Sequence, residues 1–499
     1  MRFENSDLDL FRDASGDRNP LHGDRDYARR TPYGEPVVFG MLGAVACLGR
    51  SRAGSFRRLT SIACNFRVPL YAGIEYHVEV ATDTQEAYEA RVVDGHRVVL
   101  DVKAAFEPRT PSADRCAPEL GPPVHRREPR RLRMHDLAPG HSVEGEYAPN
   151  WPELRALGER TGVDQAGIDL ADLGALAMLS YIVGMELPGE RALFSTVQLQ
   201  LDPDRPGSGE ELRFDAEPVT VDHRINRVTA DVQLHAGPRP VAVGRLVAYV
   251  RDDVPPVDVD ELRRRLPEAP GLAGTSAFVV GGSRGLGAAI VHALSLSGCD
   301  SVFAYERSHD AADNVVRTAP GPGSVVAARG DAADPEWCRG VVEDIVDRRG
   351  GLDFLICNAC PSFGPLDVHP ATIERILRHV SRSLELSAVP ISACLEALAD
   401  RQGAVTVISS SYAAAPPADW PHYVAGKRAI EGFVEVVARQ QREVAFVVVR
   451  PPKLVTDLTN TPLGRAGALA PELIAAAIAK RLADDRRPEG PVELVDTFE

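Results

Sequence analysis

Two short stretches of the chain place acidic, basic and phenolic side chains at spacings that suit proton transfer. The first is SGDRNPLH, residues 15–22, in which Asp17 and His22 flank an Asn-Pro bend. The stretch is too polar for a core, and a carboxyl and an imidazole on one bend can act as an acid and base pair. A purely structural turn is the alternative interpretation, because Gly, Asp, Asn and Pro all favour turns.

The second stretch, residues 409–427, ends in the spacing Tyr423-x-x-x-Lys427. Residues four apart on a helix share a face, so the ammonium would lie near the phenol; the alternative is an ordinary polar helix face. A nearby cation stabilises phenolate, and we expect the pKa of Tyr423 to fall below its ordinary value of about 10. Of the 56 basic residues only those at positions 103, 427, 453 and 480 are Lys, and the others are Arg. A Lys four residues after Tyr423 is therefore unusual for this chain and favours a role for its compact ammonium group.

The composition is that of an ordinary globular protein of several domains, with 499 residues of which 44% are hydrophobic. A net charge of −15 without a long basic run argues against a nucleic-acid or membrane-surface binder. There is no recognisable secretory signal, and the most apolar segment, residues 173–185, is too short to span a bilayer, so we expect a cytoplasmic protein. Eight Cys imply no disulfide framework, and the pair Cys357 and Cys360 lacks a second CxxC or a nearby His, so we expect no metal site.

Two stretches rich in Pro and charge, residues 108–140 and 252–271, are predicted linkers that divide the chain into three parts. Residues 1–107 contain the bend, an apolar helix and then alternating strand-like runs, and residues 141–251 repeat that order without a residue-level repeat. This order predicts an α+β fold in which a sheet wraps one helix. Residues 272–499 alternate apolar strands with helices, which predicts an α/β doubly wound parallel sheet.

The apolar helices of the first two parts are expected at residues 37–49 and 170–185. In the third part, the apolar run TSAFVV precedes the turn GGSRGLG and a further helix. A glycine-rich turn between a strand and a helix lets an anionic group approach the helix N-terminus.

Residues 11–42, FRDASGDRNPLHGDRDYARRTPYGEPVVFGML, resemble the MaoC-like, or (R)-specific enoyl-thioester hydratase, branch of the hotdog fold. The resemblance implies that Asp17 and His22 are the catalytic pair, that Asn19 supports them, and that the backbone N–H of Gly40 donates to the thioester carbonyl. Dehydration of a β-hydroxyacyl thioester needs a base for the α-proton and an acid for the departing hydroxyl. A helix N-terminus suits the charge that develops on the thioester oxygen.

The second part has no Asp-x-Asn-Pro-x-His string, so we interpret it as the non-catalytic half of a double hotdog. We expect it to shape the acyl tunnel and to cover a sheet edge, with no residue in a catalytic role. Family members often have His where Phe39 stands in this chain.

Residues 272–497 resemble the short-chain dehydrogenase/reductases, a Rossmann fold, through several motifs in chain order. The resemblance implies that Tyr423 protonates a substrate carbonyl as hydride arrives from a nicotinamide, that Ser410 orients the carbonyl, and that Lys427 bonds the ribose and sits beside the phenol. Ser409 and Ser411 flank Ser410, which leaves the register open by one residue.

The glycine turn, an Asn-Ala-Cys string in place of the family's Asn-Ala-Gly, and an Asp near the adenine define the implied cofactor site. Its residues are Gly281, Ser283, Arg284, Gly285, Leu286, Gly287, Arg307, Ser308, Asp331, Ala332, Asn358, Ala359, Tyr423 and Lys427. Members of the family usually have an Asn in the helix before the catalytic Ser, and residues 375–398 contain no Asn. The proton relay to solvent that this Asn serves in the family is therefore not expected in the same form in this chain.

The second strand of this part ends with Arg307 and Ser308, and Arg284 lies within the glycine turn. Arg suits a 2′-phosphate, whereas an acid would hold the free ribose hydroxyls of NAD, so we expect NADPH, with Glu306 as the residue that argues against it.

The two implied activities form a sequence in which a β-ketoacyl thioester is reduced to its (3R)-hydroxy form and then dehydrated to an enoyl thioester. Dehydratase before ketoreductase is the order found in modular polyketide synthases, so our leading hypothesis is a bifunctional enzyme that acts in trans in polyketide or fatty-acid biosynthesis. No carrier segment is evident, and the acyl chain would arrive on an acyl carrier protein or CoA. The basic segment 125–135 is either a docking site for an acidic carrier or an exposed linker.

Three alternatives stay open: a hydratase and 3-hydroxyacyl dehydrogenase of β-oxidation, a reductase with a non-catalytic hotdog binding module, and a non-enzymatic NADP-binding scaffold. Family analogy also implies a homodimer.

Overall fold

The computed structural model describes these parts of the chain: residues 1–55, 57–108, 123, 125–126, 128–205, 212–267, 271–362, 364–484 and 490–498. They form two compact units, Met1–Asp252 with Thr461–Leu463 and Asp253–Asn460 with Gly464–Glu499. Parts of both expected linkers, and one residue of the basic segment, lie outside the described residues, namely 109–122, 124, 127 and 268–270. No helix in the described parts of the chain is long and apolar enough to cross a membrane.

The helices of the first unit are α1 (Asn5–Ser15), η1 (Pro20–His22), α2 (Arg25–Ala28), α3 (Gly40–Leu48), η2 (Met134–Asp136), α4 (Trp151–Thr161), η3 (Val163–Ala166), α5 (Leu170–Tyr181) and the π-helical turn η4 (Ile182–Glu186). Its strands are β1 (Arg57–Phe66), β2 (His77–Asp83), β3 (Ala87–Asp94), β4 (Arg97–Pro108), β5 (Val143–Tyr147), β6 (Ala192–Leu201), β7 (Leu212–Asp222), β8 (Arg227–Ala236) and β9 (Arg239–Val250).

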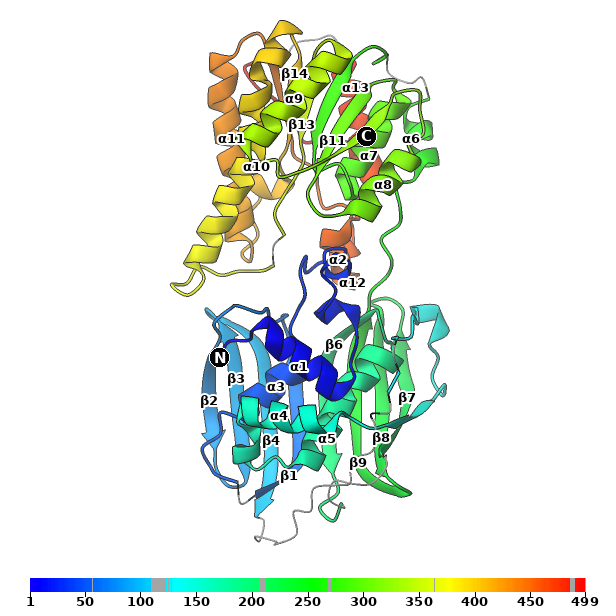
Figure 1. The fold of residues 1–499 in the computed structure, drawn as a ribbon, viewed down its shortest axis with the longest axis vertical. Helices are drawn as coiled ribbons and strands as arrows, with labels where there is room; N and C mark the ends of the chain where they lie inside the picture. The colour runs from blue at the N-terminus through cyan, green and yellow to red at the C-terminus, as the bar shows by residue number, and fades with distance from the viewer. Residues whose placement is uncertain are drawn as a thin grey trace. The chain divides into compact units, whose positions relative to one another are not determined.

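These strands form one antiparallel sheet in the order β2-β3-β4-β1-β6-β9-β8-β7-β5. The two halves join where β1 pairs with β6, for example at Ser61 and Gln200, so neither half leaves an open edge there. Helices α1, α3, α4 and α5 lie on one face of the sheet (Figure 1), and the central helices α3 and α5 pack against each other. The expectation of an α+β double hotdog is confirmed.

The structure adds elements that the periodicity did not predict. Helix α1 precedes the bend, and its N-terminus is closed by a capping box between Glu4 and Asp7. Strand β5 and helix α4 precede the second apolar helix. Helix α3 begins at Gly40, three residues later than expected, because the backbone N–H of Val38 donates to the Leu70 carbonyl and keeps this stretch extended.

The elements of the second part of the chain are α6 (Val259–Arg265), β10 (Ser276–Val280), α7 (Gly285–Leu296), β11 (Asp300–Tyr305), α8 (His309–Arg317), β12 (Val325–Arg329), α9 (Pro335–Arg349), β13 (Phe354–Cys357), α10 (Ile373–Asp400), β14 (Ala404–Ile408), η5 (Ser411–Ala413), α11 (Pro421–Gln440), β15 (Ala445–Val449), η6 (Asp457–Thr459), α12 (Pro462–Arg465), α13 (Pro471–Leu482) and β16 (Glu493–Val495).

Strands β10–β16 form a parallel sheet in the order β12-β11-β10-β13-β14-β15-β16. Every residue of β10 is buried, because both faces of the sheet are covered. Ala277 and Val279 join the core with α6, α7 and α13, whereas Phe278 and Val280 join the core with α9, α10 and α11. The expectation of a doubly wound Rossmann sheet is confirmed. Its strand order reverses beside β10, and ligands of such sheets bind at the carboxyl ends of the strands at that point.

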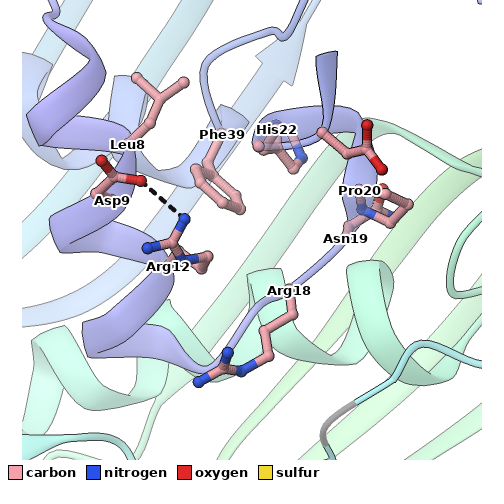
Figure 2. Close-up of a pocket in the computed structure, with 10 residues that line it drawn as sticks. Leu8, Asp9, Arg12, Arg18, Asn19, Pro20, His22 and Phe39 are labelled. Atoms are coloured by element: carbon pink, nitrogen blue, oxygen red, sulfur yellow. Dashed lines mark hydrogen bonds and ion pairs between the residues drawn. The ribbon is translucent and has the colours of Figure 1, made fainter. Parts of the chain in front are cut away.

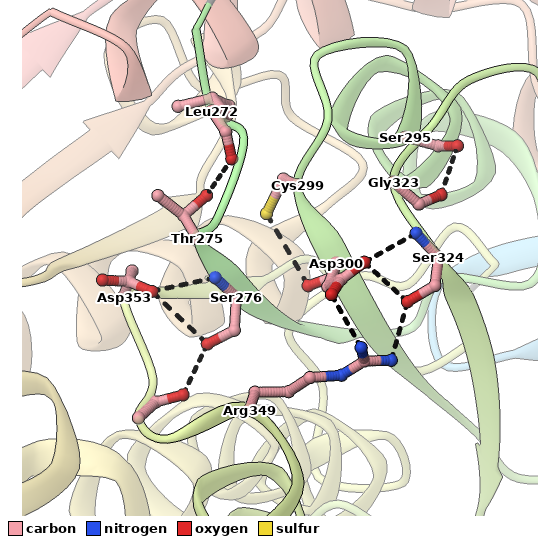
Figure 3. A network of polar contacts seen from close by, with 11 residues as sticks. Leu272, Thr275, Ser276, Ser295, Cys299, Asp300, Gly323, Ser324, Arg349 and Asp353 are labelled. Carbon is pink, nitrogen blue, oxygen red and sulfur yellow. Dashed lines mark hydrogen bonds and ion pairs between the residues drawn. The ribbon is translucent and has the colours of Figure 1, made fainter.

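The opposite edge of this sheet, at the amino ends of the strands, is held by two aspartates (Figure 3). Asp353 accepts a hydrogen bond from the backbone N–H of Ser276 at 2.8 Å. Asp300 accepts from the backbone N–H of Ser324 at 2.8 Å and from Arg349 at 2.7 Å. These contacts fix the amino ends of β10–β12, and the residues of the implied cofactor site lie at the carboxyl ends.

Candidate active sites

The first candidate site is the bend between α1 and α3. Asp17 accepts a hydrogen bond from the backbone N–H of Asn19 at 3.1 Å, and the side chain of Asn19 accepts from the backbone N–H of Leu21 at 3.0 Å. These two Asx turns fold the bend onto itself, with both polar residues buried. Phe39 is the N-cap residue of α3, and its ring stacks on the His22 imidazole at 3.9 Å between ring centres, so the imidazole lies beside the helix N-terminus that begins at Gly40.

The hydrogen bonding of His22 defines its tautomer. Its Nδ1 lies 2.7 Å from the Val37 carbonyl oxygen, which can only accept, so Nδ1 carries the proton and Nε2 is left as a proton acceptor. Burial lowers the pKa of His22 to about 4 against the opposing effect of that hydrogen bond, with the charge of Arg251 as a further lowering cause. The imidazole is therefore neutral near pH 7 and suited to act as a base.

The pKa of Asp17 is shifted in the opposite direction from that of His22. Burial raises the pKa of its carboxyl to about 7, although the hydrogen bonds from Ser180 and Asn19 lower it. Near neutral pH a substantial fraction of this carboxyl is protonated, and a protonated carboxyl can donate to a leaving hydroxyl.

The second half of the sheet supplies contacts that the sequence did not indicate. The Ser180 hydroxyl on α5 donates to Asp17 at 2.7 Å, and the Asn19 amide donates to the carbonyls of Gly184 at 3.1 Å and Gly189 at 3.0 Å. A Cβ at Gly184 would lie 2.3 Å from a carboxylate oxygen of Asp17, so the π-helical turn can approach the acid only with Gly there. The expectation that this half only shapes a tunnel thus missed its direct contact with the acid. The sequence feature that could have indicated this contact is Ser180, a polar residue near the end of the largely apolar helix α5.

A pocket of about 200 Å³ opens onto this bend (Figure 2). It lies between α1 and the bend and reaches the His22 ring, and Arg12 at its wall pairs with Asp9 at 2.7 Å. The residues that line it are Leu8, Asp9, Arg12, Arg18, Asn19, Pro20, His22, Gly23, Asp24 and Phe39. The pocket therefore reaches His22, whereas Asp17 is not among its lining residues and is 1% exposed.

The second candidate site lies at the carboxyl ends of the parallel strands. The implied cofactor residues follow consecutive strands: Gly281–Gly287 follow β10, Arg307 and Ser308 follow β11, Asp331 and Ala332 follow β12, and Asn358 and Ala359 follow β13. The sheet therefore brings residues from four separate motifs to one edge.

The glycine turn is tightly packed. Gly281 has a φ of +82°, and a Cβ at Gly287 would lie 1.9 Å from the Gly281 carbonyl oxygen. The Asn358 amide donates to the same carbonyl at 2.8 Å, which fixes the turn against β13. Ser283 and Arg284 complete the turn, and Gly285 with Leu286 begins α7, whose free N–H groups suit a phosphate.

Ser410, Tyr423 and Lys427 meet after β14. A hydrogen bond joins the Ser410 and Tyr423 side chains, whereas the hydroxyl of Ser409 donates to Glu431 at 2.6 Å, so of these two serines Ser410 lies beside the phenol. The Lys427 ammonium donates to the Ile408 carbonyl at 2.8 Å and lies 5.7 Å from the centre of the Tyr423 ring.

The expected fall in the pKa of Tyr423 is wrong. Burial raises this pKa, and the Cys360 thiol adds to the rise, while the hydrogen bond from Ser410 opposes it. The reason is that desolvation of the phenolate is the largest effect, and the Lys427 ammonium is directed to the Ile408 carbonyl.

Two ion pairs near the implied cofactor residues were also not predicted from the sequence. Arg284 pairs with Asp457 at 2.7 Å, and Asp331 pairs with Arg382 on α10 at 2.7 Å. Arg307 pairs with the neighbouring Glu306 at 2.8 Å. The partners of Arg284 and Asp331 come from distant motifs, so spacing along the chain gives no sign of them.

Comparison with known proteins gives two family matches. The family described as MaoC like domain matches residues 1–103, and the family described as short chain dehydrogenase matches residues 275–463. A 3-hydroxybutyryl-CoA dehydratase of Methylorubrum extorquens is 36% identical over 126 residues, which cover 23% of this chain and 80% of that protein. Versicolorin reductase 1 of Aspergillus parasiticus is 31% identical over 194 residues, covering 38% of this chain and 72% of that protein. Among solved structures, a short chain dehydrogenase from Burkholderia cenocepacia in complex with NADP is 27% identical, covers 45% of this chain and 98% of its own, and has a TM-score of 0.42.

Replacing Ser180 with Ala should raise the pKa of Asp17 above about 7, because the hydroxyl stabilises the carboxylate and its loss leaves the buried acid with one fewer donor. The titration can be followed by carbon-13 NMR in protein labelled at the Asp carboxyl groups, with Asp17→Asn to identify the signal. Ser180→Thr keeps a hydroxyl and should keep the wild-type titration. An unchanged titration in Ser180→Ala would contradict this assignment.

Proposed function

Because residues 1–103 of this chain belong to the MaoC-like domain family and residues 275–463 to the short chain dehydrogenase family, we propose that it catalyses two successive steps on one acyl thioester. A β-ketoacyl thioester is first reduced to its (3R)-hydroxy form, and water is then eliminated to give the enoyl thioester. The observation that carries the dehydratase assignment is a neutral His22 at the pocket and a buried, protonatable Asp17 on the same bend.

In the elimination, His22 Nε2 accepts the α-proton and Asp17 gives its proton to the departing hydroxyl, so that water leaves. The negative charge that develops on the thioester oxygen meets the backbone N–H of Gly40 at the start of α3. Asn19 holds the bend through its contacts with the second half of the sheet. That half lacks the catalytic string itself and serves to frame the bend.

The reductase residues fit a nicotinamide dinucleotide, because the close contact between Gly281 and Gly287 leaves a bare backbone at the N-terminus of α7. When bound, this cofactor supplies the hydride. Tyr423 donates a proton to the carbonyl oxygen of the substrate, and Ser410 orients that oxygen through the hydroxyl that already bonds the phenol. Lys427 is positioned by the Ile408 carbonyl to reach the ribose hydroxyls.

We propose NADPH as the cofactor, held by Arg284 and Arg307 through its 2′-phosphate, with Asp331 and Ala332 near the adenine and Asn358 and Ala359 near the ribose. Two guanidinium groups near the carboxyl ends of β10 and β11 support a phosphate ligand. Their present partners, Asp457 and Glu306, would be exchanged for the phosphate.

The acyl chain would arrive on CoA or an acyl carrier protein. The similarity to a reductase named for versicolorin and to a dehydratase named for a CoA ester supports an assignment to polyketide or fatty-acid biosynthesis. A homodimer through helices flanking the parallel sheet is supported by exposed apolar side chains on both of them, Leu377 on α10 and Val436 on α11.

Single-site variants separate the two steps. With NADPH and a β-ketoacyl N-acetylcysteamine thioester, the wild type should consume NADPH and release a product that has lost water. Asp17→Asn should consume NADPH normally but accumulate the hydroxyacyl product, with dehydration slowed by about 10²–10⁴-fold. Tyr423→Phe should lose NADPH consumption while still dehydrating added (3R)-hydroxyacyl thioester.

Each variant is the folding control for the other, and product masses with NADPH absorbance report both steps. Wild-type rates of enoyl formation by Asp17→Asn would refute the dehydratase assignment, and unchanged reduction by Tyr423→Phe would refute the reductase assignment.

The dehydration step should have a bell-shaped pH dependence. Its kcat/KM should fall below about pH 4, where His22 gains a proton, and above about pH 7, where Asp17 loses the proton that it must donate. Initial rates on the (3R)-hydroxyacyl thioester between pH 3.5 and 9 measure this. A rate that rises steadily through pH 8 would show that ionised Asp17 is the active form.

Replacing Arg307 with Ala should lower the preference for NADPH over NADH on the order of 10-fold, because a charge-assisted contact to the 2′-phosphate is lost. Glu306→Gln is the matched variant and should change the preference in the opposite direction, because it removes the negative charge beside the phosphate. The ratio of kcat/KM for the two cofactors is the readout, and an unchanged ratio in Arg307→Ala would exclude this residue as the phosphate ligand.

A further inference from the structure

One carbonyl oxygen, that of Glu190, collects hydrogen bonds from three parts of the first unit. The Asn19 amide in the bend donates to it at 3.4 Å, the Tyr27 hydroxyl on α2 at 2.9 Å, and the Arg251 guanidinium just after β9 at 3.0 Å. Arg251 also donates to the Tyr27 hydroxyl at 2.7 Å. The cluster therefore ties the candidate catalytic bend to the end of β9.

Arg251 is a buried cation without a buried counter-ion. It is 4% exposed, and no carboxylate of the described residues lies within ion-pair distance of it. The nearest acidic residue in the cluster, Glu190, directs its carboxylate to Arg131 at 2.6 Å and offers Arg251 only its backbone. The Tyr27 ring lies 5.2 Å below the guanidinium and offers a partial compensation. A buried charge that is not neutralised costs stability, so its retention calls for a role.

The group on which this charge acts is His22. The guanidinium lowers the pKa of the imidazole, because a second positive charge in the same buried region disfavours imidazolium. The other charged or titratable groups around the imidazole and its pocket are Asp17 in the bend, Asp9 and Arg12 on α1, and Arg18, Asp24, Tyr27 and Tyr33 beside them. Arg12 is paired with Asp9 and Asp13, so its charge is balanced, whereas that of Arg251 is not.

We propose that Arg251 is a positioning residue of the dehydratase site, which holds the catalytic bend through the Glu190 carbonyl and adds a buried positive charge that disfavours the imidazolium form of His22. The inference rests on the proposed dehydratase function and adds a residue from the second half of the sheet to it. It also explains why a cation is buried in a cluster with hydrogen-bond acceptors but no carboxylate.

The test compares Arg251→Met, Arg251→Lys and Tyr27→Phe. In Arg251→Met the acid limb of the dehydration pH profile should move to higher pH, because imidazolium is no longer repelled by the guanidinium. Arg251→Lys keeps the charge and Tyr27→Phe keeps the guanidinium, so both should keep the wild-type acid limb. NADPH-linked reduction in the second unit reports that each chain is intact.

The titration of His22 itself provides a readout that needs no turnover. Nitrogen-15 NMR of histidine-labelled full-length protein, with His22→Asn to identify the signal, should show the same upward shift in Arg251→Met alone. If no thioester is dehydrated but the shift is present, the proposed function fails and the effect of Arg251 on His22 stands. An unshifted His22 in Arg251→Met, or an equal shift in Arg251→Lys, overturns the proposal.

Discussion

The burial of the Asp17 carboxyl is the constraint on which the first unit depends. Removing a carboxylate from water is costly unless donors replace the lost solvent. One donor, the backbone N–H of Asn19, is local, but the other is the Ser180 hydroxyl from the opposite half of the sheet. The bend can therefore be built only if the two halves form one body, and the pairing of β1 with β6 is what makes them one. The Gly184 turn, which would collide with the acid if it carried a Cβ, shows how closely the two halves meet.

In the second unit the candidate residues are brought together in a different way. Its residues are gathered by the parallel sheet itself, because every strand end points to the same edge and the strand order reverses beside β10. The glycine turn needs only a missing Cβ and one amide, that of Asn358, to hold its backbone in place. Local sequence therefore specifies this site to a much greater degree than it specifies the bend of the first unit.

This difference explains what the sequence could and could not predict. The strands, the glycine turn and the Asp-x-Asn-Pro-x-His string are local patterns, and the fold class followed from them. Ser180 and Glu190 lie more than 160 residues from the bend that they contact, and Arg251 reaches the bend only through the Glu190 carbonyl. None of the three belongs to a motif, so only the three-dimensional structure reveals them. Helix α1 was missed because its capping residues, Glu4 and Asp7, precede a largely polar stretch. The pKa of Tyr423 was misjudged because spacing gives the distance to Lys427 but not the burial of the phenol.

The raised pKa of Tyr423 keeps the phenol protonated near neutral pH, as the proton donation that we propose requires. A phenol whose pKa is raised holds its proton at neutral pH, which suits a group that donates a proton to a carbonyl oxygen and not one that removes a proton from an alcohol. Asp17, whose pKa is raised to about 7 by burial, is likewise held partly protonated beside a neutral His22. Reduction needs a proton donor at the carbonyl, and elimination needs one at the leaving hydroxyl. Burial without full neutralisation thus keeps a proton on the proposed donor of each site near neutral pH.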